Sequence, residues 1–365
     1  MTCNSGLSDG IKKKHMKELA GYVDKTLRPH PVLRSLFFEV TTLCNEHCKH
    51  CGSRCGDVKA DDPLTLDEWK GVLDRVKFGF NISKLRLCIT GGEPLLMPEF
   101  FELMAYAHSL GFTWGMTSNG TLITKEAALK LKETGMSTVS ISVDGLEESH
   151  DIFRQSPGSY RKTMEGIANL LETKAFKHVQ ITTVVHRGNY NELDEMYEVF
   201  KKTGVRSWRV INIEPIGRAK DDPELMLDKE QYRGLIDFIR EHRFEDKMQV
   251  SYGCSHYLGV EDEREVRPWY FLCNAGVYTA SIMNNGNIGA CLDIERRPEV
   301  IFGNIRKDSL KEVWEKGFEI FRTDFRKTGQ CKKCKQYRFC RGDSFHTWDF
   351  DKMEPGICMY KMLNE

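Results

Sequence analysis

The chain contains 365 residues, of which 40% are hydrophobic and 29% are charged, a composition typical of a globular protein with room for roughly two domains. Lys plus Arg and Asp plus Glu both total 53, so the net charge is zero, and a general nucleic-acid surface, which needs a basic excess, is not expected. No apolar run approaches the ~20 residues of a membrane span, and residues 1–10 do not resemble a signal peptide, so we expect a soluble cytoplasmic protein with no membrane span.

In chain order, residues 1–35 are expected to form an N-terminal segment with one amphipathic helix over residues 11–27. From residue 36, short β-branched runs alternate with segments in which apolar residues recur every three or four positions. The β-branched runs predict six strands, over residues 36–42, 85–90, 113–118, 139–143, 179–186 and 208–214. The periodic segments predict six helices, over residues 65–78, 98–109, 124–134, 160–173, 191–203 and 228–242.

Six consecutive βα units predict an α/β fold with parallel strands and right-handed crossovers, over residues 36–247. An open doubly wound sheet and part of a barrel both fit this pattern. Every predicted strand is followed by polar or glycine-rich residues, and in parallel α/β folds the carboxyl ends of the strands carry the active site. After about residue 250 the helical periodicity fades, so residues 248–365 are expected to form a separate C-terminal segment.

The 13 cysteines stand out in a chain without an export signal, because clustered thiols in a reducing compartment usually bind metal. Cys44, Cys48 and Cys51 follow the first predicted strand within one short loop. A tetrahedral zinc site would need a fourth ligand, such as His47 or His50. A [4Fe–4S] cluster bound by three cysteines would instead keep one iron with an open coordination position. The spacing alone leaves both alternatives open.

With the sequence CNEHCKHC over residues 44–51, Gly-Gly-Glu-Pro over residues 91–94 and six βα units, the chain resembles the radical S-adenosylmethionine superfamily. The resemblance implies a partial (β/α)6 barrel, similar to part of a TIM barrel, in which Cys44, Cys48 and Cys51 hold a [4Fe–4S] cluster. It further implies that S-adenosylmethionine ligates the fourth iron and is cleaved reductively to a 5′-deoxyadenosyl radical, which abstracts hydrogen from a substrate. A reducing electron donor such as flavodoxin or ferredoxin is then an expected partner.

The same resemblance implies residues that bind S-adenosylmethionine. Two glycines carry no Cβ, so their backbone can approach an amino-acid ligand closely, and the resemblance assigns this segment to the methionine amino group. Ser142 and Asp144 match positions that contact the cofactor carboxylate or ribose, and Arg154 is suited to pair with that carboxylate. The cofactor-binding residues expected in this way are Gly91, Gly92, Glu93, Pro94, Ser142, Asp144 and Arg154.

A second group of cysteines follows near the C-terminus, and by spacing alone it could be a four-thiolate zinc site. Behind a barrel of this superfamily, it resembles the SPASM extension, which carries auxiliary [4Fe–4S] clusters. That resemblance implies one complete outer cluster, held by Cys331, Cys334, Cys340 and Cys358.

A second, inner auxiliary cluster is expected to be held by Cys273 and Cys291, with Cys254 as the candidate third ligand. Because Ser344 stands where the SPASM pattern has a cysteine, three alternatives stay open: a non-cysteine ligand completes this cluster, one of its irons keeps an open position, or the cluster is absent. The other candidates close by in the sequence are His256, Asp343 and Ser344 itself.

No residue type in the sequence identifies the substrate or a catalytic acid or base. SPASM-containing relatives mostly modify peptides and proteins, so the resemblance favours a peptide or protein maturase. A tetrapyrrole-modifying radical enzyme and a non-catalytic metal-binding protein are the alternatives.

Overall fold

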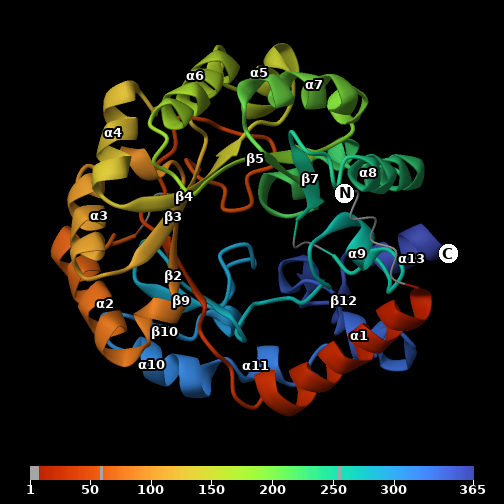
Figure 1. Ribbon diagram of the computed structural model, residues 1–365. Helices are drawn as coiled ribbons and strands as arrows, with labels where there is room; N and C mark the ends of the chain where they lie inside the picture. Colours follow the sequence, from red (N-terminus) through yellow and green to blue (C-terminus); the bar gives the residue numbers. More distant parts are fainter. Residues whose placement is uncertain (1–7, 58–60, 254–255) are drawn as a thin grey trace.

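The computed structural model describes residues 8–57, 61–253 and 256–365, and Figure 1 shows a curved sheet surrounded by helices. The main sheet has ten strands in the order β10-β9-β8-β1-β2-β3-β4-β5-β6-β7. The eight strands from β8 through β1 to β7 pair in parallel, whereas β9 and β10 are antiparallel additions. The strands of this sheet are β1 Ser35–Glu39, β2 Arg86–Thr90, β3 Thr113–Ser118, β4 Met136–Ser142, β5 His178–Val185, β6 Ser207–Asn212, β7 Gln249–Tyr252, β8 Thr279–Ile282, β9 Asn287–Gly289 and β10 Gly303–Asn304.

The helices that link consecutive strands lie on the outside of the ring, and α1 lies with the C-terminal segment at its open side (Figure 1). A separate two-stranded sheet pairs β11 Trp348–Asp349 with β12 Glu354–Pro355. The helices are α1 Asp9–Tyr22, α2 Leu66–Gly79, α3 Phe100–Ser109, α4 Lys125–Glu133, α5 Glu147–Arg154, α6 Ser159–Glu172, α7 Leu193–Thr203, α8 Lys229–Glu241, α9 Glu263–Val266, α10 Leu310–Glu312, α11 Glu319–Arg322, α12 Tyr337–Cys340 and α13 Met359–Asn364.

Local sequence signals explain where the barrel helices begin. Thr65 caps α2 through a capping box with Glu68, and Asp228 caps α8 through a second capping box with Gln231. Each box satisfies backbone N–H groups that have no partner inside the helix.

The main core lies between the outer face of the sheet and the helices. Leu36 and Phe38 of β1 are fully buried, and the ring of Phe38 packs 4.8 Å from that of Trp69 on α2. Trp208 of β6 is equally buried, in edge-on contact with Phe200 of α7. Alternate residues of each strand therefore face the inside of the barrel.

The alternating α/β pattern and the partial barrel implied by the resemblance are confirmed, and β7, β8 and α5 are elements of the barrel that the prediction lacks. β7 and β8 extend the parallel sheet on either side, and each has only four residues, too few for a recognisable pattern. The short helix α5 precedes α6 and places Arg154 in its last turn. Among the described residues, no helix is both long and apolar enough to cross a membrane.

Candidate active site

The first three cysteines lie in the loop that leaves the carboxyl end of β1. Cys48 is buried, Cys44 and Cys51 are half-buried, and all three are free thiols. The Cys51 N–H donates to the Cys48 carbonyl at 3.2 Å, which forms a tight turn between these two residues. In the part of the chain that the structure describes, no three Cys, His, Asp or Glu side chains meet at the spacing of a single metal ion.

The double glycine after β2 fits tightly against this cysteine loop. The Gly92 N–H donates to the Thr41 carbonyl and the Glu93 N–H to the Leu43 carbonyl, both at 2.8 Å. A Cβ on Gly92 would lie 2.0 Å from the Leu43 carbonyl oxygen, and one on Gly91 would lie 2.4 Å from that of Thr41. Neither contact is sterically tolerable, so the absence of side chains here lets the two loops join.

Glu93 is fully buried and fixes the exit of the neighbouring strand β3. Its carboxylate accepts hydrogen bonds from Ser118 Oγ at 2.9 and 3.0 Å and from the Asn119 N–H at 2.9 Å. Burial raises the pKa of Glu93 to about 7, despite these donors. Pro94 then begins a short 3-10 turn, in which the Leu95 N–H donates to Glu93.

Asp144 and Arg154 meet beneath the cysteine loop in a buried charge network that also includes Glu46. Arg154 donates to Asp144 Oδ2 at 2.7 and 3.0 Å and to Glu46 Oε2 at 2.7 Å. Burial would raise the pKa of Asp144, but the Arg154 guanidinium, His50, His150 and the hydrogen bond from the Val184 N–H together lower that pKa to about 2. Ser142 ends β4 on the same side. The roles of Ser142, Asp144 and Arg154 toward S-adenosylmethionine stay predictions.

Two features in and around the cysteine loop were not predicted from the sequence. His50, Phe153 and His186 form one stack, with centroid distances of 4.7 and 3.9 Å. Cys55, four residues after Cys51, is buried, and its N–H lies 3.4 Å from Cys51 Sγ. The Cys55 thiol, which also approaches that sulfur, lowers the pKa of Cys51 to about 6 and so favours the thiolate that iron requires. Burial instead raises the pKa of Cys44 to about 11 and also raises that of Cys48, so the fit to an iron–sulfur cluster rests on the three free thiols in one loop.

The four cysteines predicted to hold an outer auxiliary cluster come together in the structure. Cys331, Cys334, Cys340 and Cys358 line one small cavity, with Tyr337, Gly342 and Asp343 around them. All four are free, and burial raises the pKa of Cys331 to about 11. Their co-location agrees with a four-thiolate site, and the nature of the bound group stays a prediction.

The cysteines of the expected inner cluster are placed differently. Cys273 lines a second small cavity with Cys340 and the buried Arg326, whose guanidinium stacks 3.6 Å from the Phe345 ring centroid. Cys291 follows β9, with its Sγ 3.8 Å from Asp293 Oδ2, and it is not among the described residues that line this second cavity. Cys254 lies outside the described residues.

Two further candidates for the inner ligand, His256 and Asp343, contact each other instead. His256 Nδ1 lies 3.0 Å from Asp343 Oδ2, and His256 Nε2 lies 3.0 Å from Glu214 Oε1. Glu214 follows β6 and is also 2.6 Å from His346 Nε2. Burial would lower the pKa of His256, but Asp343 and Glu214 raise it to about 10. This buried network joins the barrel to the C-terminal segment, and the sequence gives no signal for it because its members are far apart along the chain.

Comparison with known families supports the same two regions. The family model described as the radical SAM superfamily matches residues 38–200, and the model described as an iron–sulfur cluster-binding domain, SPASM, matches residues 273–335.

Two curated relatives differ in their described activity. The AdoMet-dependent heme synthase of Methanosarcina barkeri is 30% identical over 350 residues, which cover 90% of this chain and 97% of the relative. The mycofactocin maturase MftC of Mycolicibacterium smegmatis is 29% identical over 315 residues, which cover 84% of this chain and 76% of the relative. The solved structure of native anSMEcpe with bound AdoMet matches with a TM-score of 0.73 and 22% sequence identity. The match covers 90% of this chain and 94% of the anSMEcpe chain. This last likeness concerns the fold.

Proposed function

The chain belongs to the radical S-adenosylmethionine superfamily, and we propose that it modifies a carboxylated tetrapyrrole. The observation that carries the reaction class is the three-cysteine loop held against Gly91 and Gly92 at the carboxyl end of the barrel. Cys44, Cys48 and Cys51 would hold a [4Fe–4S] cluster there, with one iron left for S-adenosylmethionine. When bound, the cluster and S-adenosylmethionine together supply a 5′-deoxyadenosyl radical that takes a hydrogen atom from the substrate.

The chain's own residues prepare the site for this chemistry. The Gly-Gly-Glu-Pro turn, with Glu93 and Pro94 buried, fixes the position of the cysteine loop, and we propose that Ser142, Asp144 and Arg154 receive the polar groups of S-adenosylmethionine. Arg154 already holds two carboxylates, so contact with a third would require it to share its five N–H donors among them.

The C-terminal segment would hold auxiliary clusters. We propose one complete [4Fe–4S] cluster on Cys331, Cys334, Cys340 and Cys358, supported by their common cavity. A second cluster, on Cys273 and Cys291 with Cys254 as third ligand, remains part of the proposal.

The tetrapyrrole class is supported by the heme synthase relative, whose whole length nearly matches this chain. A peptide or protein substrate is the second candidate, and the MftC relative favours it, although it matches over a smaller share of its length. In either case we propose a cytoplasmic enzyme reduced by flavodoxin or ferredoxin.

An anaerobic assay of the reconstituted protein tests both the reaction class and the substrate. The protein is incubated with dithionite and S-adenosylmethionine, alone, with iron coproporphyrin III, with other carboxylated tetrapyrroles, or with peptides encoded beside its gene. We expect 5′-deoxyadenosine formation, faster with a tetrapyrrole whose mass changes. If peptides but no tetrapyrrole increase 5′-deoxyadenosine formation, the second candidate, a peptide or protein substrate, replaces the tetrapyrrole proposal. No 5′-deoxyadenosine from a fully loaded protein would contradict the reaction class.

A further inference from the structure

A cavity of about 760 Å³ opens beside the barrel, away from the cysteine loop. Arg34, just before β1, and Tyr278, just before β8, line it from the amino ends of these strands. Helix α1 and the loop over residues 267–274 form its other walls. Among the described residues β7 is an edge strand and does not pair with β8, so the cavity lies where the barrel is open.

Arg209 connects this cavity to the inside of the barrel. Its neighbours Trp208 and Val210 are fully buried on the outer face of β6, so Arg209 faces inward. Its Nε donates to Thr182 Oγ1 of β5 at 3.2 Å, which agrees with that orientation. The cavity is therefore continuous with the inner wall of the barrel at β6.

The lining is cationic and only partly neutralised. Neither Arg34 nor Arg209 forms an ion pair with a carboxylate anywhere in residues 8–57, 61–253 or 256–365, whereas Arg267 lies 3.4 Å from Glu263. The acidic residue in the lining, Glu18, lies 3.9 Å from Lys14 outside the cavity. Arginine side chains without a carboxylate partner suit carboxylates supplied by a ligand.

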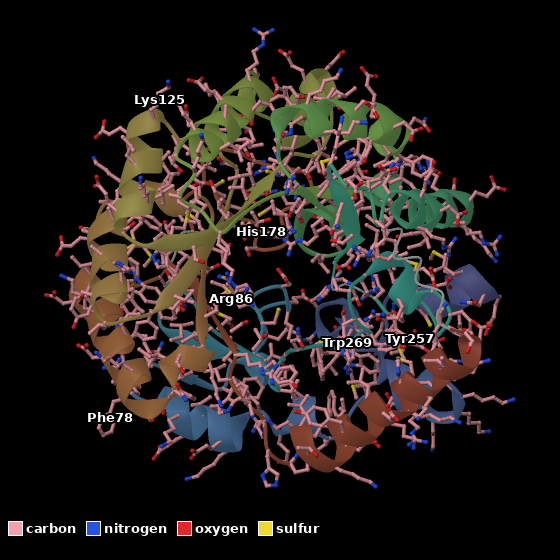
Figure 2. All side chains as sticks on the ribbon, in the orientation of Figure 1. Phe78, Arg86, Lys125, His178, Tyr257 and Trp269 are labelled. Carbon is pink, nitrogen blue, oxygen red and sulfur yellow. The ribbon has the colours of Figure 1, made fainter. Side chains whose placement is uncertain are left out.

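Aromatic side chains form the other part of the lining. Tyr252, Trp269, Tyr270 and Tyr278 all line the cavity, and Trp269 is 58% exposed, a high value for so large an apolar side chain. Figure 2 shows Trp269 beside the opening in the middle of the ring, with Arg86 across from it. Arg86 begins β2, is not one of the residues that line the cavity, and has no ion pair among the described residues. These groups suit a planar ring that carries several carboxylates.

We propose that this cavity binds the carboxylate-bearing edge of a planar, polyanionic aromatic substrate, with Arg34 and Arg209 as its carboxylate ligands. The inference rests on the proposed tetrapyrrole class and assigns it a site. From Arg209 to the end of β6 at Asn212 the strand advances three residues, about 10 Å, and the chain then continues to Arg218, whose N–H donates to the Cys51 carbonyl at 3.1 Å. A substrate held at this end must be large, as a macrocycle is, for its opposite edge to approach the cysteine loop.

The test is a binding titration of the reconstituted protein, without S-adenosylmethionine, followed by the porphyrin absorbance. Iron coproporphyrin III, with four carboxylates, is compared with its tetramethyl ester, which keeps the ring and loses the charges. We expect the parent protein to bind the acid and not the ester. The Arg34→Gln/Arg209→Gln double variant should bind the acid at least about 10-fold more weakly, because a charged hydrogen bond is lost at each position. With lysine in place of glutamine at position 209, which keeps the positive charge, part of the lost affinity for the acid should return.

The matched control is Arg161→Gln, on the outer surface of α6, where the side chain is 78% exposed and pairs with Glu147. It should bind the acid as the parent does. Circular dichroism and iron content show whether the double variant folds. If it folds poorly, the single variant Arg34→Gln and the comparison of acid with ester test the proposed binding site instead.

Equal affinity of the parent and the arginine variants, or equal binding of acid and ester, would overturn the inference even if the protein converts tetrapyrroles. Failure of the parent to bind the acid would overturn it as well. Charge-dependent binding without any conversion, in a protein that cleaves S-adenosylmethionine, would instead contradict the proposed function and leave this site standing.

Discussion

Gly92→Ala tests whether the double glycine holds the cysteine loop in place. The added Cβ would lie 2.0 Å from the Leu43 carbonyl oxygen and 3.0 Å from Cys44 Cβ. Because the first contact is with backbone and not with a flexible side-chain end, the loop over residues 41–44 must move. The hydrogen bonds from Gly92 and Glu93 to this loop, both 2.8 Å long, would then break or lengthen.

The cost has two parts. Overpacking a well-packed site costs about 1–3 kcal/mol. Two backbone hydrogen bonds contribute about 0.5–1.5 kcal/mol each. The substitution should therefore lower the free energy of unfolding by about 2–6 kcal/mol, a large part of the roughly 5–15 kcal/mol of an ordinary domain. Movement of Cys44 should also lower the iron content of the barrel site.

The assay is urea unfolding of the iron-free protein, together with iron per chain after reconstitution. The control is Gly21→Ala in α1, where a Cβ would meet nothing within 4 Å. That variant should be as stable as the parent or gain up to about 1 kcal/mol, because alanine favours a helix. If Gly92→Ala unfolds at the parent's urea concentration and binds the parent's iron, the steric argument is wrong.

Three further predictions concern ligands and pH. Replacing Cys44, Cys48 and Cys51 together by Ala should abolish 5′-deoxyadenosine formation, because a methyl group cannot ligate iron, while the C-terminal iron remains; an active triple variant would refute the assignment. Cys334→Ala should lower iron content and substrate turnover but preserve the cleavage of S-adenosylmethionine; full turnover would leave its cluster a structural role. Burial raises the pKa of Glu93 from 4.5 to about 7. Between these two pH values the folded iron-free protein therefore binds a proton at Glu93 that the unfolded chain has released. The free energy of unfolding should accordingly fall as the pH rises from 4.5 to 7. Glu93→Gln should flatten that slope in a series of urea titrations, and an unchanged slope would contradict the shift.

Features that depend on neighbouring residues were predictable from the sequence. The strands and barrel helices follow from short-range periodicity, and β3 has the predicted bounds, Thr113–Ser118. The two cysteine groups are visible because their members are close in the chain. β7 and β8 could not be predicted from the sequence. A strand of four residues is too short for a pattern of its own, and it forms because it pairs with the edge of the sheet.

Long-range contacts explain what sequence reasoning missed in the site. Glu214, His256 and His346 come from three distant segments and meet only after the C-terminal segment folds onto the barrel. Arg34 and Arg209 likewise lie 175 residues apart and line one cavity because β1 and β6 belong to one curved sheet. Neither residue stands in a motif.

The double glycine shows how a correct motif can be explained by an incomplete physical reason. From the sequence, Gly91 and Gly92 are expected to let a ligand approach the backbone. In the structure, a Cβ on either residue would collide with the backbone of Thr41 or Leu43. The cysteine loop and the double glycine therefore pack as one unit, because the loop after β2 can contact the cysteine loop this closely only where it has no side chains. Substitutions at these glycines should therefore affect the iron site before they affect any contact with S-adenosylmethionine.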